Sequence, residues 1–123
     1  TVEKFELRRL FRFDFSLQQQ STQQWDFPNG WPPLKHMMIE GLRKSNDPRM
    51  QQKSFILAQK WILANYHVFQ TDNAMWEKYD VASIKPQTGG GGEYNVQAGF
   101  GWTNGVALDL LVAYGDRLTS PKK

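Results

Sequence analysis

Four consecutive glycines, Gly89 to Gly92, lie within a long predicted loop between residues 73 and 102. Glycine reaches backbone conformations that are barred to other residues, so a run of four indicates that something approaches the backbone closely. Glu93 and Tyr94 follow the run at once, and aromatic and amide residues recur over residues 97–105. Loops of this length usually exist for function, and this mixture of carboxylate, aromatic and amide groups suits a surface that binds sugars.

Three helices are predicted around the long loop, which indicates an all-α fold class. The first is expected over residues 34–44, after the pair Pro32-Pro33. The second follows Asn46 or Asp47 as the N-cap, has Pro48 at its first position and runs to about residue 69. The third is expected to start near residue 103 or 104 and to stop at Gly115, a common helix terminator.

Apolar residues at spacings of three and four predict which face of each helix is buried. The residues expected to form these faces are Leu34, Met37, Met38 and Leu42 in the first helix and Phe55, Ala58, Trp61, Ile62, Tyr66 and Phe69 in the second. The third helix carries the apolar residues Ala107, Leu108, Leu110, Leu111 and Tyr114. Trp61 lies inside its stripe and is expected to be a core residue.

Length and charge place the chain among single-domain proteins and argue against a nucleic-acid binder. It has 123 residues and a net charge of +3, from 15 basic and 12 acidic residues. Lys and Arg are scattered, so no nucleic-acid partner is expected. There is no cysteine. No apolar run reaches the roughly 20 residues of a membrane span, and the first residues lack the apolar stretch of a secretory signal.

Residues 1–21 differ in kind from the rest of the chain. Phe11, Phe13 and Phe15 alternate with polar residues, which favours a short strand, whereas Phe5, Leu7, Leu10 and Phe11 would also suit a helix. Both alternatives stay open for this segment.

Glu77 and Glu93 are the carboxylates whose neighbours suggest chemistry. Trp76 and Tyr79 flank the first, and Tyr94 follows the second. Burial against aromatic rings and a neighbouring cation act in opposite directions on a carboxyl pKa. An inverting glycosidase needs two such groups, one acid and one base. From residue type alone, two solvated loop charges are the commoner arrangement.

Other candidate sites are weaker. The tryptophans in the loops could stack on sugar faces, although core packing explains most aromatic residues. Gly99, Gly101 and Gly105 miss the dinucleotide-binding spacing. His36 and His67 lack the sequence spacing of a zinc site, so no metal is expected.

Three blocks of the chain resemble the trehalases, which hydrolyse α,α-trehalose to two glucose molecules. They are Gln24-Trp25-Asp26-Phe27-Pro28-Asn29-Gly30-Trp31, Glu77-Lys78-Tyr79-Asp80-Val81, and Gly89 to Tyr94 with Gly99-Phe100-Gly101-Trp102-Thr103-Asn104-Gly105-Val106. Their order and spacing fit the C-terminal part of that family over residues 22–123, with residues 1–21 as an unassigned leader.

The resemblance implies the C-terminal part of an (α/α)6 toroid and an inverting reaction without metal or other cofactor. It makes Glu77 the general base. It places Glu93 in contact with substrate, with Tyr94 beside it, and Trp25 and Trp31 near the sugar. Trehalose is the implied small-molecule substrate. Animal members are secreted or membrane-anchored, and the compartment of this chain is left open.

Two departures from the family shape the expectation for activity. Trehalases are several times longer, and the upstream aspartate motif that supplies their general acid does not appear here. The segment by itself is therefore expected to be inactive, and a non-catalytic remnant that binds carbohydrate or associates with a trehalase is the alternative. Part of a toroid should also leave apolar flanks uncovered, at Phe55, Trp61, Leu110 and Leu111, which favours self-association.

Overall fold

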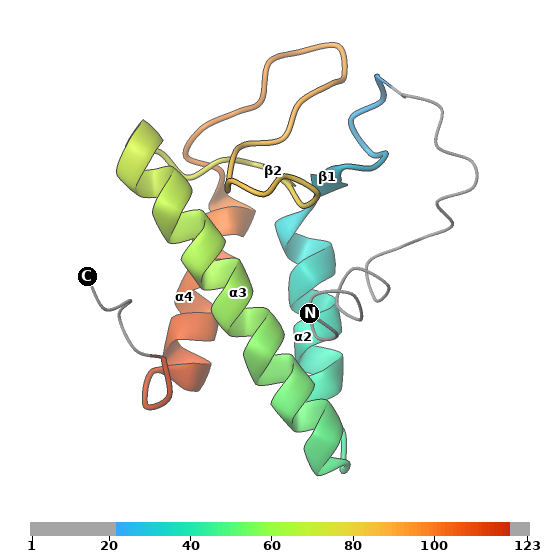
Figure 1. Cartoon of the computed structure of the whole chain (residues 1–123), viewed down its shortest axis with the longest axis vertical. Coiled ribbons are helices and arrows are strands. Elements are labelled where there is room, and N and C mark those ends of the chain that lie inside the picture. The colour runs from blue at the N-terminus through green and yellow to red at the C-terminus, as the bar shows by residue number, and fades with distance from the viewer. Residues whose placement is uncertain (1–21, 119–123) are drawn as a thin grey trace.

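A computed structural model describes residues 22–118, so the predictions for residues 1–21 fall outside the described part of the chain. That part is mostly helical, as predicted. The elements in chain order are β1 (Asn29–Gly30), α2 (Pro32–Arg43), α3 (Pro48–Asp72), β2 (Tyr79–Asp80) and α4 (Gly101–Tyr114). The three helices pack against one another. Figure 1 shows the long loop between α3 and α4 together with β1 at one end of the helices, and the short turn between α2 and α3 at the other end.

The helix boundaries follow the predicted signals in two cases. Asp47 is the N-cap of α3 and accepts a hydrogen bond from the backbone N–H of Arg49 at 2.8 Å. Gly115 is the C-cap of α4. Because Pro32 needs no backbone N–H partner, α2 begins there, two residues before the predicted start.

The predicted start of α4 at residue 103 or 104 is wrong. The helix begins at Gly101 with Phe100 as the N-cap and no side-chain cap. The hydroxyl of Thr103 donates instead to the carbonyl oxygen of Trp76, in the long loop. Thr103 therefore anchors the loop to the first turn of α4.

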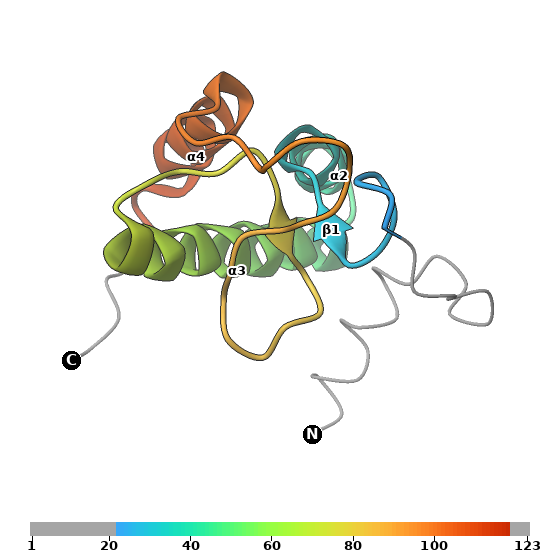
Figure 2. The ribbon, with the colours of Figure 1, turned by 90° about the horizontal axis from the view of Figure 1, so that it is seen from above.

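One core joins the three helices and β2. Figure 2 shows α2 and α4 lying next to each other over α3. The buried apolar residues are Ile39, Leu57, Ala58, Trp61, Val68, Tyr79, Val106, Leu110 and Tyr114. The hydroxyl of Ser54 donates to the carbonyl oxygen of Ile39 and contacts the hydroxyl of Tyr114, both at 2.7 Å, so polar contacts also connect all three helices.

The predicted buried faces are partly wrong. Tyr66 and Phe69 of α3 are exposed, because the helix turns Asn65 and Val68 inward in their place. Leu34 and Met37 of α2 are also exposed, since Ile39 occupies the core position. Trp61 is buried as expected.

The expected uncovered flanks are found at only some positions. Trp61 and Leu110 are buried, so that part of the prediction is wrong. Leu111 is exposed and Phe55 is half-buried against the core. The described part of the chain still exposes apolar residues on each helix, including Leu34, Met37, Tyr66, Phe69, Leu108, Leu111 and Val112.

Leu110→Ala is expected to lower the free energy of unfolding by about 2–5 kcal/mol, because it removes a side chain that is 0 % exposed and leaves a cavity between the helices. Leu108→Ala on the same helix is the matched control, because Leu108 is 65 % exposed and should cost less than about 0.5 kcal/mol. Urea denaturation of both variants measures the difference. Equal losses would mean that α4 does not pack as the structure has it.

Candidate active site

The three blocks singled out in the sequence meet at the end of the helices where the long loop between α3 and α4 lies. β1 and β2 pair antiparallel, with Asn29 opposite Asp80 and Gly30 opposite Tyr79. The side-chain amide of Asn29 donates to the carbonyl oxygen of Gly90 at 2.8 Å and accepts from its N–H at 3.0 Å. These bonds tie the first block to the glycine run across 61 residues of sequence.

Glu77 lies where the second and third blocks cross. Its N–H donates to the carbonyl oxygen of Gln97 at 2.9 Å, and its own carbonyl oxygen accepts from the indole Nε1 of Trp102 at 2.9 Å. The backbone on both sides is held as well, because Trp76 pairs with Ala98 and Gly89 donates to the carbonyl oxygen of Lys78 at 3.0 Å. The position of Glu77 is therefore fixed by contacts from distant parts of the chain.

The side chain of Glu77 is buried, which excludes the solvated arrangement for this residue. Glu77 is 1 % exposed and Lys78 is 0 % exposed. The ammonium group of Lys78 lies 3.8 Å from Oε1 of Glu77, donates to the carbonyl oxygen of Gly91 at 3.1 Å, and lies 5.3 Å from the ring centroid of Trp31. A carboxylate this deep in the protein requires such a counter-charge.

Two buried polar atoms around Lys78 have no hydrogen-bond partner among the residues that the structure describes. They are Oε1 of Glu77 and the indole Nε1 of Trp31. An unpaired buried polar group costs about 1–3 kcal/mol, so such groups normally find a partner in a ligand, in water or in another segment. The site therefore has unused hydrogen-bonding capacity next to its buried charge pair.

The close approach predicted for the glycine run is made by the chain itself. Gly91 and Gly92 have φ values of +79° and +91°, and a Cβ atom there would lie 2.7 Å from the carbonyl oxygen of Thr22 and 2.9 Å from the side chain of Gln24, respectively. The N–H of Gly92 donates to the carbonyl oxygen of Thr22 at 2.8 Å. These glycines let the loop pack on residues 22–24.

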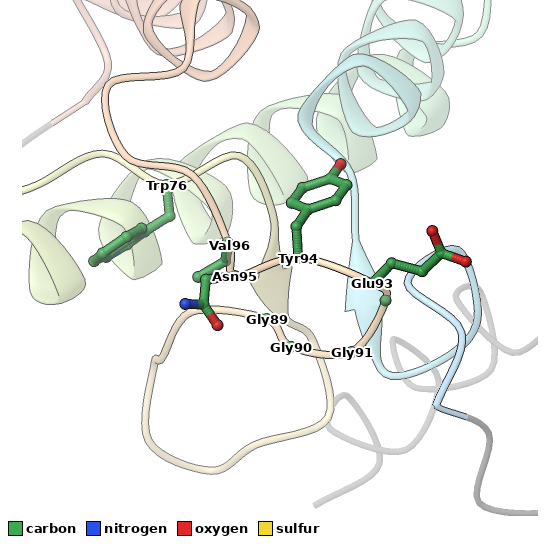
Figure 3. A pocket seen from close by; sticks show the side chains of 9 residues that line it. Trp76, Gly89, Gly90, Gly91, Glu93, Tyr94, Asn95 and Val96 are labelled. Atoms are coloured by element: carbon green, nitrogen blue, oxygen red, sulfur yellow. The ribbon is translucent and has the colours of Figure 1, made fainter.

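Glu93 and Tyr94 line a pocket of about 760 Å³ together with the glycine run. Its other lining residues are Trp76, Asn95 and Val96. Figure 3 shows Trp76 and Glu93 at opposite ends of this lining. Glu93 is exposed at the pocket, whereas Glu77 is buried next to Trp76 and is not part of the lining.

Trp25 and Trp31 form a stacked pair, with ring centroids 3.9 Å apart and an interplanar angle of 18°. Trp25 is 60 % exposed and Trp31 is 3 % exposed. The rings of Trp102 and Trp31 also contact each other, in an edge-to-face arrangement. Trp31 therefore covers one ring face of Trp25, and the other ring face of Trp25, its outer face, is open to solvent.

Two further groups near the site have shifted pKa values. Burial raises the pKa of the Tyr79 hydroxyl, which accepts a hydrogen bond from the N–H of Trp76. Burial also lowers the pKa of the Lys35 ammonium to about 8. Lys35 lies beside β1, since a Cβ on Gly30 would meet its side chain.

The sequence did not single out Asn29 or Lys78 as site residues. Asn29 gave no signal beyond its place in the first block. Lys78 was noted as a neighbouring charge, but a lysine is usually solvated, and its complete burial follows only from the fold.

Asp80 stabilises the loop that follows it, because its carboxylate accepts hydrogen bonds from the N–H groups of Ala82 and Ser83 and from the side-chain amide of Gln87.

Comparisons with known proteins identify the same family that the three sequence blocks resemble. The trehalase family model matches residues 2–115, a range that takes in most of the segment predicted to differ from the family. The chain is 58 % identical to the trehalase of Oryctolagus cuniculus over 102 residues, 83 % of this chain and 17 % of that protein. It is 57 % identical to the trehalase of Homo sapiens over 105 residues, 85 % of this chain and 18 % of that protein.

Relatives outside mammals match over a similar range. The trehalase of Apis mellifera is 47 % identical over 102 residues, which cover 83 % of this chain and 16 % of that protein. The chain thus spans less than a fifth of the length of these relatives. Within the described residues, the helices are too short or too polar to span a membrane. The match over residues 2–115 places this chain in the trehalase family.

Proposed function

We propose that this chain carries the general base and part of the substrate site of an enzyme that hydrolyses α,α-trehalose to two glucose molecules with inversion. The observation that carries the proposal is the burial of Glu77 at the point where the three family-like blocks meet. A base of this kind must be held in one place, and the ammonium group of Lys78 lies 3.8 Å from its carboxylate as a counter-charge.

The unused hydrogen-bonding capacity of Glu77 supports the same role. Its Oε1 has no hydrogen-bond partner among the described residues, although the backbone on either side is held firmly. A general base must accept a proton from the attacking water, so it needs an oxygen that the protein does not occupy. Glu77 would take that proton, with Lys78 as the counter-charge beside it.

Substrate binding is assigned to the pocket and to the stacked tryptophans. Glu93 and Tyr94 line a pocket whose volume of about 760 Å³ is in the range of small-molecule sites, roughly 300–1,000 Å³. Glu93 would accept hydrogen bonds from sugar hydroxyl groups, and Tyr94 would bind beside it. Trp25 would present its outer face to a sugar ring, with Trp31 fixing its orientation.

Glu93→Ala, made in a full-length trehalase that carries this segment, is expected to weaken binding of a trehalose-like inhibitor by about 1–3 kcal/mol, since hydroxyl groups of the ligand lose their acceptor. Calorimetric titration of the inhibitor measures the change. Asp116→Ala is the matched control, because Asp116 is exposed beyond the end of α4, outside the pocket lining. Unchanged affinity in the Glu93 variant would show that this carboxylate is only a solvated loop charge.

A second function stays open, in which the chain is a non-catalytic remnant that binds carbohydrate or associates with a trehalase. The exposed apolar residues on all three helices offer a surface for such an association, because such surfaces are usually covered in the native assembly. In an (α/α)6 toroid, neighbouring helices would cover them. Sedimentation of the purified chain, alone and mixed with a full-length trehalase, distinguishes a monomer from a self-associated or bound form.

A further inference from the structure

Three side chains of types that can bind metal ions lie close together on α2 and α4, and they take no part in the candidate active site. His36 and Glu40 of α2 are four residues apart and so share one side of the helix. Asp109 of α4 faces them, with its Oδ2 2.7 Å from Nε2 of His36. One donor atom from each of the three residues lies within 4.8 Å of the others.

We propose that His36, Glu40 and Asp109 bind a first-row divalent transition metal ion, with zinc as the best fit. One imidazole nitrogen and two carboxylate oxygens are the donor types that zinc accepts in proteins. Magnesium and calcium prefer oxygen ligands alone, so the histidine disfavours them. The inference is independent of the proposed sugar chemistry, because none of the three residues lines the pocket or contacts Glu77.

The geometry needs only small side-chain movements. Ligand atoms about 2.0–2.2 Å from a tetrahedral zinc ion lie about 3.4 Å from one another. His36 and Asp109 would separate slightly from their present 2.7 Å, and Glu40 would approach from within 4.8 Å. His36 and Glu40 are half-buried and Asp109 is exposed, so water can reach the fourth position.

The cations around the cluster are compatible with this site. Arg43 donates two hydrogen bonds of 2.7 Å to Glu40, and Lys44 lies 3.8 Å from the same carboxylate. The two carboxylate oxygens offer about four lone-pair positions, so Glu40 can keep a bond to Arg43 while it binds a metal ion. Ligating carboxylates are commonly oriented by such hydrogen bonds. Arg43 would therefore hold Glu40 in place.

A bound ion would connect α2 to α4 directly and stabilise the described fold by mass action, since the unfolded chain brings no such group together. The chain should bind one equivalent of zinc, and its melting temperature should rise as zinc is added. Magnesium at the same concentration should have no such effect.

The test uses the two histidines of the chain, which contains no cysteine. Zinc chloride is titrated calorimetrically into the full chain, and the histidine ring signals are followed by NMR. His36→Ala should lower zinc affinity by more than about tenfold. His67→Ala is the matched control, because His67 is exposed on α3, and it should leave the affinity unchanged. Circular dichroism confirms that both variants keep their helices.

Asp109→Asn and Glu40→Gln provide the second check, because each removes a charged donor while keeping its size. Both should weaken zinc binding without changing helix content. Equal binding by the wild-type chain and the His36 variant would overturn the proposal, and so would loss of binding in the His67 variant. Titration without saturation at one equivalent would identify an adventitious ion only.

Discussion

Glu77→Gln, introduced into a full-length trehalase that carries this segment, is expected to lower kcat by several orders of magnitude with only a modest change in KM. The amide cannot take a proton from the attacking water, whereas the size of the side chain and its place in the long loop are preserved. Because the loss would occur only in the transition state, steady-state kinetics on trehalose should show it in kcat and kcat/KM alike.

Two controls separate the loss of a base from the loss of structure. The variant also removes the charge that Lys78 pairs with, so its melting temperature must be measured beside its activity. Azide attacks without giving up a proton, and it should therefore restore part of the turnover if only the base is missing. A variant that keeps more than about a tenth of wild-type turnover would argue against general-base catalysis at this position.

The existence of the helices could be predicted from the sequence because their signals are local. Asp47 and Pro48 mark the start of α3, and Gly115 marks the end of α4. The buried faces were harder to predict. Tyr66 and Phe69 fit an apolar stripe better than the polar Asn65, so spacing alone did not show that α3 turns Asn65 and Val68 inward. Packing against α2 and α4 decides that rotation.

In the candidate site, too, features set by neighbouring residues could be predicted, whereas contacts between residues far apart in the sequence could not. The block around Glu77 could be identified from its amino-acid sequence, but its burial depends on contacts from Gln97 and Trp102. The glycine run correctly indicated a close approach, yet the partner is residues 22–24 of the same chain. His36 and Asp109 are 73 positions apart, so their contact had no sequence signal at all.

Residues 1–123 assayed alone are expected to release no glucose from trehalose. An inverting reaction needs an acid that protonates the leaving oxygen as well as a base that activates water, with the two carboxyl groups about 6.5–9.5 Å apart. In the proposed mechanism Glu77 would fill only the role of base. Asp80 braces its loop through three N–H donors, and Asp26 is exposed. Neither lines the pocket that Glu93 and Tyr94 line.

Glu93 is the remaining carboxylate at the pocket, and it decides how the assay is interpreted. The purified chain is incubated with trehalose and glucose release is measured, with Glu77→Gln as the control for contaminating activity. Glucose release that is equal in both samples comes from a contaminant and agrees with the expectation. Robust release that disappears in the Glu77 variant would contradict it, and Glu93→Gln would then test whether this exposed carboxylate has taken the role of the acid. In that case the described residues would hold both halves of the catalytic pair, and the non-catalytic alternative would be excluded.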